Sequence, residues 1–175
     1  MNLEFKPASE SKDILSASVW EGIVTLNATQ DIQVAEINPE FADGDSLNRE
    51  YGVPFDQEAN CLVLEGKRGD ETKYAALLIP YGKKANTNAT VKRPLDVSKV
   101  GFAPLDFVLE QTGMEFGAIT PIGLPETWSL LIDSQILEQE KILVGGGLVQ
   151  SKLLVPTQLL TQLPNAQVIE GLAKD

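Results

Sequence analysis

Hydrophobic positions recur with both a helical and a strand period along this chain. Near the N-terminus, apolar residues recur at helical spacing: Ile14, Leu15, Val19, Ile23 and Leu26. Because a serine-rich stretch precedes them and can cap a helix, we expect an amphipathic helix over residues 11–26. A second, brief helix is expected from Asp43 to Tyr51, since Gly52 can adopt the left-handed conformation that ends a helix.

Short apolar, β-prone runs lie between the expected helices. Cys61–Glu65 and Tyr74–Pro80 are joined by a polar segment with two glycines, which predicts a β-hairpin. Further strands are expected at Gln33–Ile37, Ala118–Ile122, Leu130–Asp133, Ile142–Gly145 and Gln167–Glu170. Further helices are expected at Asn86–Arg93, Pro104–Gln111 and Pro156–Leu163. This pattern predicts one α/β (α+β) domain over residues 1–175, with a mixed, mostly antiparallel β-sheet and packed helices.

Composition favours an ordinary globular protein. The chain has 175 residues, of which 43% are hydrophobic, and it contains no apolar run near the ~18 to 20 residues of a membrane span. Its first residues lack the basic and then apolar order of a signal peptide, so we expect a soluble, cytoplasmic protein that keeps Cys61 reduced.

The charge distribution limits which nucleic acids the chain can bind. A net charge of −11 disfavours extensive phosphate contact, so neither DNA nor a long RNA footprint is expected. Basic residues nevertheless concentrate in the middle third: Lys67, Arg68, Lys73, Lys83, Lys84, Lys92, Arg93 and Lys99. They can either grip one RNA end or simply be solvated surface charges.

The chain contains no histidine and a single cysteine. Ser-His-Asp and Cys-His catalysis, histidine-ligated zinc and thiolate metal clusters are therefore excluded, and no metal or cofactor is expected. Hydrolysis by a positioned water, backbone donors, amides, carboxylates and lysines remains possible.

The most informative segment is the apolar run Thr112–Gly123, which contains glycines and Pro121. Glycine lets the backbone approach a ligand, and proline removes a hydrogen-bond donor, so an ordinary central strand is disfavoured here. The segment is expected either to bind a ligand along its backbone or to form a bulge needed for packing.

Together with Asp56–Leu64, Asp133 and Ile142–Gly147, this segment resembles the YbaK and prolyl-tRNA synthetase-associated editing family. The resemblance covers about residues 41–172, with residues 1–40 adding a helix and a strand to the same domain. It implies a protein that hydrolyses mischarged aminoacyl-tRNA in trans at the tRNA 3′ end. It leaves open an aminoacyl-tRNA synthetase as a second partner.

The resemblance also implies a set of site residues. Relatives carry a substrate-gripping lysine on the strand where this chain has Asn60, an amide without charge. Asn60 and Gly117 are the expected catalytic residues. The expected substrate-binding residues are Ala118, Ile119, Thr120, Pro121, Asp133, Gly145, Gly146, Lys73 and Arg93.

Several interpretations stay open at this stage. Because of Asn60, a non-catalytic module that binds aminoacyl-adenosine or another small ligand is an alternative, and an interaction domain with an acidic surface is a third. If Asn60 faces the pocket, strand alternation predicts that Cys61 faces the core. Asp133 can orient a substrate hydroxyl or merely satisfy turn backbone. Trp20 and Trp128 can stack on a base or pack.

Overall fold

The structure, a computed structural model, describes residues 1–175. The strands are β1 (Phe5–Pro7), β2 (Gln33–Glu36), β3 (Ala59–Arg68), β4 (Glu71–Pro80), β5 (Lys84–Ala85), β6 (Lys99–Phe102), β7 (Ser129–Asp133), β8 (Lys141–Gly145), β9 (Ser151–Pro156), β10 (Ala166–Ile169) and β11 (Ala173–Lys174). The helices are α1 (Ala17–Thr25), α2 (Gly44–Tyr51), α3 (Ala89–Leu95), α4 (Leu105–Thr112) and α5 (Thr157–Leu160). The predicted single α/β domain with mixed strand directions and packed helices is confirmed.

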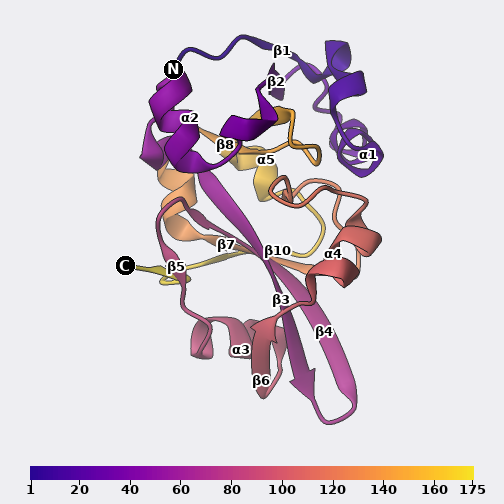
Figure 1. The fold of residues 1–175 in the computed structure, drawn as a ribbon. Helices are drawn as coiled ribbons and strands as arrows, with labels where there is room; N and C mark the ends of the chain where they lie inside the picture. The colour runs from indigo at the N-terminus through magenta and orange to yellow at the C-terminus, as the bar shows by residue number, and fades with distance from the viewer.

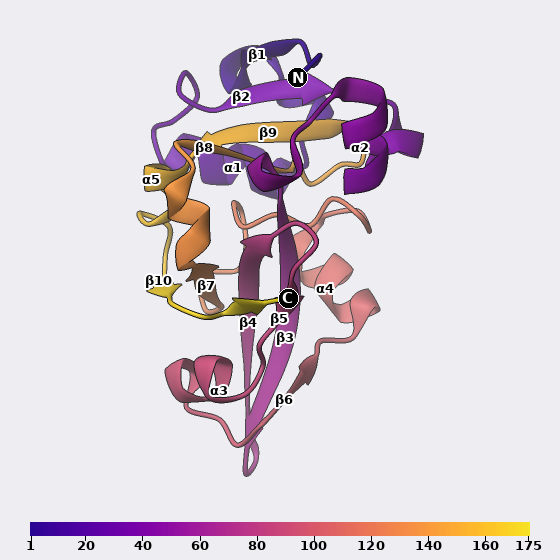
Figure 2. The same ribbon diagram turned by 90° about the vertical axis from the view of Figure 1, so that its left-hand side faces the viewer.

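The strands form three sheets rather than the one expected. An antiparallel sheet has the order β1-β2-β9-β8, and a five-stranded sheet has the order β10-β7-β4-β3-β6. In the second sheet β10, β7 and β4 are parallel, whereas β4, β3 and β6 are antiparallel; β11 and β5 pair separately. The β3–β4 hairpin runs from the first sheet to the opposite end of the molecule, where α3 and β6 lie (Figure 1; Figure 2).

Two apolar clusters cover the two faces of the hairpin. Ala59 and Leu78 lie in the larger cluster, which also contains α1 and the inner residues of β8 and β9. Leu64 and Leu77 lie in the second cluster under α3. Since a fully buried leucine contributes about 1.5–3 kcal/mol, the alternation along β3 and β4 stabilises both layers at once.

Local end signals predicted several elements correctly. Asp43 caps α2 by accepting a hydrogen bond from the Ser46 N–H at 3.0 Å, and Gly52 ends the helix in the left-handed conformation. The hairpin is confirmed but longer than expected, because β3 and β4 continue to a tight turn at Gly69 and Asp70.

Other boundaries were wrong. The helix expected over residues 11–26 begins only at Ala17, because Ser16 caps it through the Val19 N–H. A 3₁₀ turn at Lys12–Ile14 precedes it. The helix expected at Pro156–Leu163 is shortened to α5, mainly because it ends at Leu160. The residues before it form β9, a strand the sequence analysis missed.

The strand expected at Ala118–Ile122 does not form. Residues 113–124, here called the glycine loop, follow α4 without regular structure. Gly117 and Gly123 have φ values of +87° and +90°, which an extended strand does not use, and Pro121 cannot donate to a ladder. The loop instead pairs with the β8–β9 connection, where the Gly147 N–H donates to the Ala118 carbonyl at 3.0 Å.

The other end of the glycine loop lies against α1. A Cβ at Gly123 would stand 2.3 Å from the Ser18 carbonyl oxygen, and one at Gly22 would stand 2.8 Å from the Gly123 nitrogen. Both glycines therefore permit backbone contact between the helix and the loop. In the whole fold, no helix combines the length and apolar character that crossing a membrane requires.

Candidate functional site

A cavity of about 460 Å³ lies between β3, the glycine loop, α4 and the adjoining parts of β8 and β9. This volume falls within the usual range for small-molecule sites, ~300–1,000 Å³. A second cavity of about 510 Å³ lies between α1 and the far side of the glycine loop, but no lysine or arginine lines it. The first cavity is the candidate site because it combines apolar walls with a buried ion pair.

An unpaired stretch of the edge of β3 forms the floor of the cavity. The Glu58 carbonyl accepts from the Tyr81 N–H next to β4, whereas the Val63 carbonyl accepts from the Ala103 N–H on the opposite edge. Each residue of an antiparallel strand directs its N–H and C=O to one side, and successive residues alternate between the two sides. Cys61 is two residues from Val63 and therefore directs its N–H and C=O to the same outer edge. Pairing with β6 begins only at Leu64, so this part of the edge is available to a ligand.

The structure brings four of the expected site residues together around this cavity. Asn60, Gly117, Ile119 and Gly145 all line it. Cys61 packs against the larger apolar cluster, as expected, and it lines the cavity as well. The cavity lies over an edge of the sheet, where side chains from both faces of β3 can border the same space.

Three residues of the glycine loop that were expected at the site do not line the cavity. The Ala118 carbonyl binds the Gly147 N–H, and Ala118 itself is buried. Thr120 is completely buried, and its hydroxyl has no hydrogen-bond partner. Pro121 lines the second cavity. Of the loop, the candidate site therefore contains Phe116, Gly117 and Ile119.

The remaining expected residues lie outside the cavity. Lys73 donates to the Leu95 carbonyl at 3.1 Å on the α3 side of the hairpin, and Arg93 lies on α3. Asp133 is fully buried, where its carboxylate accepts from the Gln135 N–H at 2.8 Å and the Ala173 N–H at 2.6 Å. At Gly146 a Cβ would stand 2.0 Å from Ser151 Oγ, so this glycine permits close packing.

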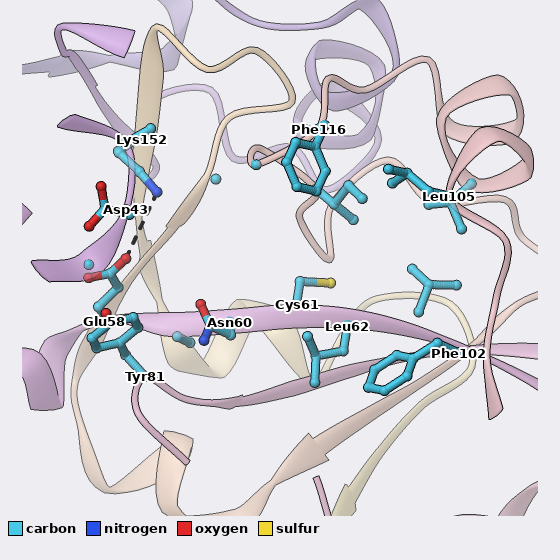
Figure 3. Close-up of a pocket in the computed structure, with 18 of the residues that line it drawn as sticks. Asp43, Glu58, Asn60, Cys61, Leu62, Tyr81, Phe102, Leu105, Phe116 and Lys152 are labelled. Atoms are coloured by element: carbon cyan, nitrogen blue, oxygen red, sulfur yellow. Dashed lines mark ion pairs between the residues drawn. The ribbon is translucent and has the colours of Figure 1, made fainter. Parts of the chain in front are cut away.

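A buried ion pair, missed by the sequence analysis, forms one end of the cavity (Figure 3). Lys152 from β9 and Glu58 ahead of β3 are only 6% and 3% exposed, and Lys152 Nζ lies 3.9 Å from Glu58 Oε1. The other carboxylate oxygen of Glu58 is buried without a hydrogen-bond partner. A lysine inside the apolar run Ser151–Pro156 was the available signal, because charged residues are seldom fully buried unless they are paired.

Burial shifts the pKa values of Glu58 and Lys152 in opposite directions. Desolvation raises the pKa of Glu58, and the nearby Asp43 and Asp45 raise it further, while Lys152 partly offsets the shift. Desolvation lowers the pKa of Lys152, and the negative charges of Glu58 and Asp43 partly offset that shift. The loss of solvation therefore dominates for both groups.

Two further titratable groups line the cavity. Burial of the Cys61 thiol raises its pKa to about 12, so this sulfur is a poor nucleophile at neutral pH. Tyr81 stacks on Phe55 with ring centroids 5.7 Å apart, and desolvation raises its pKa. No cluster of three potential metal ligands exists in the structure, so the polar end has no ready-made metal site.

The opposite end of the cavity is apolar and open to solvent. Phe102 at the end of β6 and Phe116 on the glycine loop are 71% and 70% exposed, and Leu105 at the start of α4 is 43% exposed. Figure 3 shows Phe102 and Leu105 far from the ion pair, with Cys61 and Leu62 between the two ends. Exposed aromatic rings at a cavity mouth suit a planar ligand group, since stacking removes their faces from water.

Comparison with known proteins identifies the class of this fold. A family model described as an aminoacyl-tRNA editing domain matches residues 38–163. The crystal structure of a candidate trans-editing enzyme for prolyl-tRNA synthetase is 18% identical and covers 97% of this chain and 98% of its own, with a TM-score of 0.74. A hypothetical protein is 22% identical over 90% of this chain and 99% of its own, with a TM-score of 0.77.

Proposed function

This chain belongs to the aminoacyl-tRNA editing domain family, and on that premise we propose that it hydrolyses the ester bond of mischarged aminoacyl-tRNA as a free-standing enzyme. One observation carries the proposal. A single cavity joins an unpaired strand edge, a glycine of the loop and a buried cation. These parts suit ester hydrolysis, because a positioned water and fixed donors around the carbonyl are sufficient for this reaction.

The two ends of the cavity suit the two parts of an aminoacyl-adenosine. The terminal base would stack on Phe102 and Phe116, since single-stranded RNA ends are commonly held by aromatic rings. The aminoacyl ester would then lie over Cys61, whose backbone N–H can donate to it. Asn60, on the same stretch of strand, would orient the attacking water through its amide.

The charge distribution supports contact with one RNA end only. Eight of the 14 lysines and arginines lie between Lys67 and Lys99, a stretch that contains only three carboxylates. Lys99 begins β6, and the exposed Phe102 ends it, so one of these lysines lies on the strand that reaches the aromatic end of the cavity. A short approach by the acceptor end of tRNA is thus compatible with a net charge of −11.

A deacylation screen tests this function. The protein is incubated with a panel of correctly charged and mischarged tRNAs, and the released amino acid is measured against spontaneous hydrolysis. We expect turnover of at least one mischarged tRNA and sparing of its correctly charged counterpart. If no member of the panel is hydrolysed above background while the protein binds a non-hydrolysable aminoacyl-adenosine, the chain is a binding module instead.

Two exposed residues provide matched variants for that screen. Phe116→Ala should raise KM for the tRNA with a smaller change in kcat, because stacking positions the substrate without touching the ester. Val168→Ala on β10 removes a half-exposed apolar side chain outside the cavity and should leave both constants unchanged. Addition of candidate aminoacyl-tRNA synthetases to the assay tests for the second partner, through binding or faster turnover.

A further inference from the structure

The ammonium group of Lys152 has no hydrogen-bond acceptor within the protein. The nearest carboxylate oxygen, Glu58 Oε1, is 3.9 Å away, too far for a hydrogen bond. Yet the lysine is only 6% exposed, so bulk water cannot fully solvate it. A buried ammonium with unused donors is costly unless an acceptor reaches it, and the space next to it is the cavity.

The sheet fixes where this lysine stands. In register, Lys152 lies between Ala35 on β2 and Gly145 on β8, both small residues. Gly145 itself lines the cavity and has no side chain to obstruct it. In Figure 3 the Lys152 side chain descends from β9 toward Glu58, so its charged end faces the polar end of the cavity.

The surrounding charges determine which acceptor fits. Glu58 and Asp43 line the cavity with Lys152, and both are carboxylates. An anion such as a phosphate would meet two negative groups for one positive group, which disfavours it. A neutral carbonyl would not be repelled, and it would gain from the ammonium as negative charge develops on its oxygen.

We propose that Lys152 is the catalytic residue that stabilises the oxyanion during ester hydrolysis, and that Glu58 positions its ammonium group. This inference rests on the function proposed above. Water oxygen bonds to the ester carbon, and the carbonyl electron pair moves to the oxygen beside Lys152 Nζ. The carbonyl then reforms as the bond to the ribose oxygen breaks, and the proton lost by the water ends on that oxygen. The products are a free amino acid and tRNA with a free terminal hydroxyl.

The critical variant is Lys152→Met, which keeps the length of the side chain and removes its charge. Deacylation by the 175-residue chain is measured under single-turnover conditions on the mischarged tRNA found in the screen. Loss of an oxyanion-stabilising group typically lowers the rate about 100- to 1,000-fold. Binding of the matching 3′-aminoacylamino-3′-deoxyadenosine should change less than about threefold, because its amide carbonyl never becomes an oxyanion.

Two controls separate this role from a structural one. Lys141→Met removes an exposed lysine at the start of β8 and should leave the rate unchanged. Glu58→Gln should retain most of the maximal rate but move the high-pH decline to lower pH, because the carboxylate helps to keep the ammonium protonated. The other titratable groups that line the cavity are Asp43, Cys61 and Tyr81, and none of them is altered.

The outcomes are distinguishable. Wild-type deacylation with a slow, folded Lys152→Met supports the proposal. Wild-type deacylation with an unchanged Lys152→Met overturns the role of Lys152 alone and leaves the enzyme assignment intact. A double variant, Lys152→Met with Glu58→Gln, removes both charges; if it regains the wild-type rate, the ammonium is not required and the proposal fails. Absence of wild-type deacylation overturns the proposed function and this inference together.

Discussion

Gly117→Ala should lower kcat/KM for deacylation strongly and Tm only slightly, whereas Gly113→Ala should lower Tm alone. Both glycines lie in the glycine loop and have positive φ values, +87° and +66°. A Cβ at Gly117 would find its nearest neighbour, Val149 Cγ1, 3.9 Å away, and one at Gly113 would find no atom within 4 Å. Neither substitution creates a steric overlap, so backbone strain is the common cost.

The size of that cost follows from the left-handed conformation. A side chain there costs about 1–2 kcal/mol, and in a chain of this size each kcal/mol lowers Tm by about 2–4 °C. Both variants should therefore melt about 2–8 °C below wild type. Gly117 also lines the cavity, whereas Gly113 ends α4 outside it. The methyl group of Gly117→Ala would occupy space next to the ester or displace the ester slightly, and either effect should lower kcat/KM about 100-fold.

The assay pairs thermal unfolding with deacylation of the same samples. Activity is measured well below the lower of the two melting temperatures, so that both variants are fully folded. Similar Tm values with a large difference in kcat/KM are the expected result. Equal losses of kcat/KM in the two variants would show that the loop conformation has only a structural role, and the reasoning for Gly117 would be refuted.

Three further predictions use other parts of the structure. Asn60→Lys in the Lys152→Met background should recover part of the lost deacylation rate, because both positions line the same cavity; no recovery would show that a cation at Asn60 cannot reach the ester. Asp133→Asn should lower the free energy of unfolding by about 1–3 kcal/mol in guanidinium titrations, because Asp133 accepts two backbone hydrogen bonds, while the rate per folded molecule stays unchanged. A lost rate at unchanged stability would instead return Asp133 to the site. Because the pKa of Cys61 is raised to about 12, its alkylation by iodoacetamide at pH 8 should be on the order of 1,000-fold slower in the folded than in the unfolded chain, and should accelerate as pH rises; equal rates by mass spectrometry would contradict the raised pKa.

Features governed by nearby residues were predictable from the sequence. Asp43 and Gly52 delimit α2 through contacts within one turn, and the β3–β4 hairpin follows from two apolar runs around a short polar turn. The resemblance to editing domains also placed Asn60 and Gly117 on one cavity, which the structure shows. Such signals depend on local geometry, so a single chain suffices to recognise them.

Features governed by distant pairing were not predictable in the same way. Ala118–Ile122 has the composition of a strand, but close contacts at Gly123 and Gly145 hold it as a loop. In the sequence Lys152 is an isolated charge in an apolar run. Only the pairing of β9 with β2 and β8 brings it to the cavity. Lys73 was expected to reach the substrate from the strand paired with β3, yet in register it lies opposite Gly66 and donates to the Leu95 carbonyl on the α3 side.

The contacts of α1 and β2 bear on where the folding unit begins. The matched family region starts at residue 38, but β2 pairs with β9 at Ala35 and Lys152, and Gly22 of α1 supports the glycine loop at Gly123. A fragment that begins at residue 38 and keeps the C-terminal strands would lack β2, one neighbour of the strand that carries Lys152, and the support that α1 gives the loop. It should therefore aggregate or fail to bind aminoacyl-adenosine, so laboratory truncations and transplants of this domain need the first 37 residues.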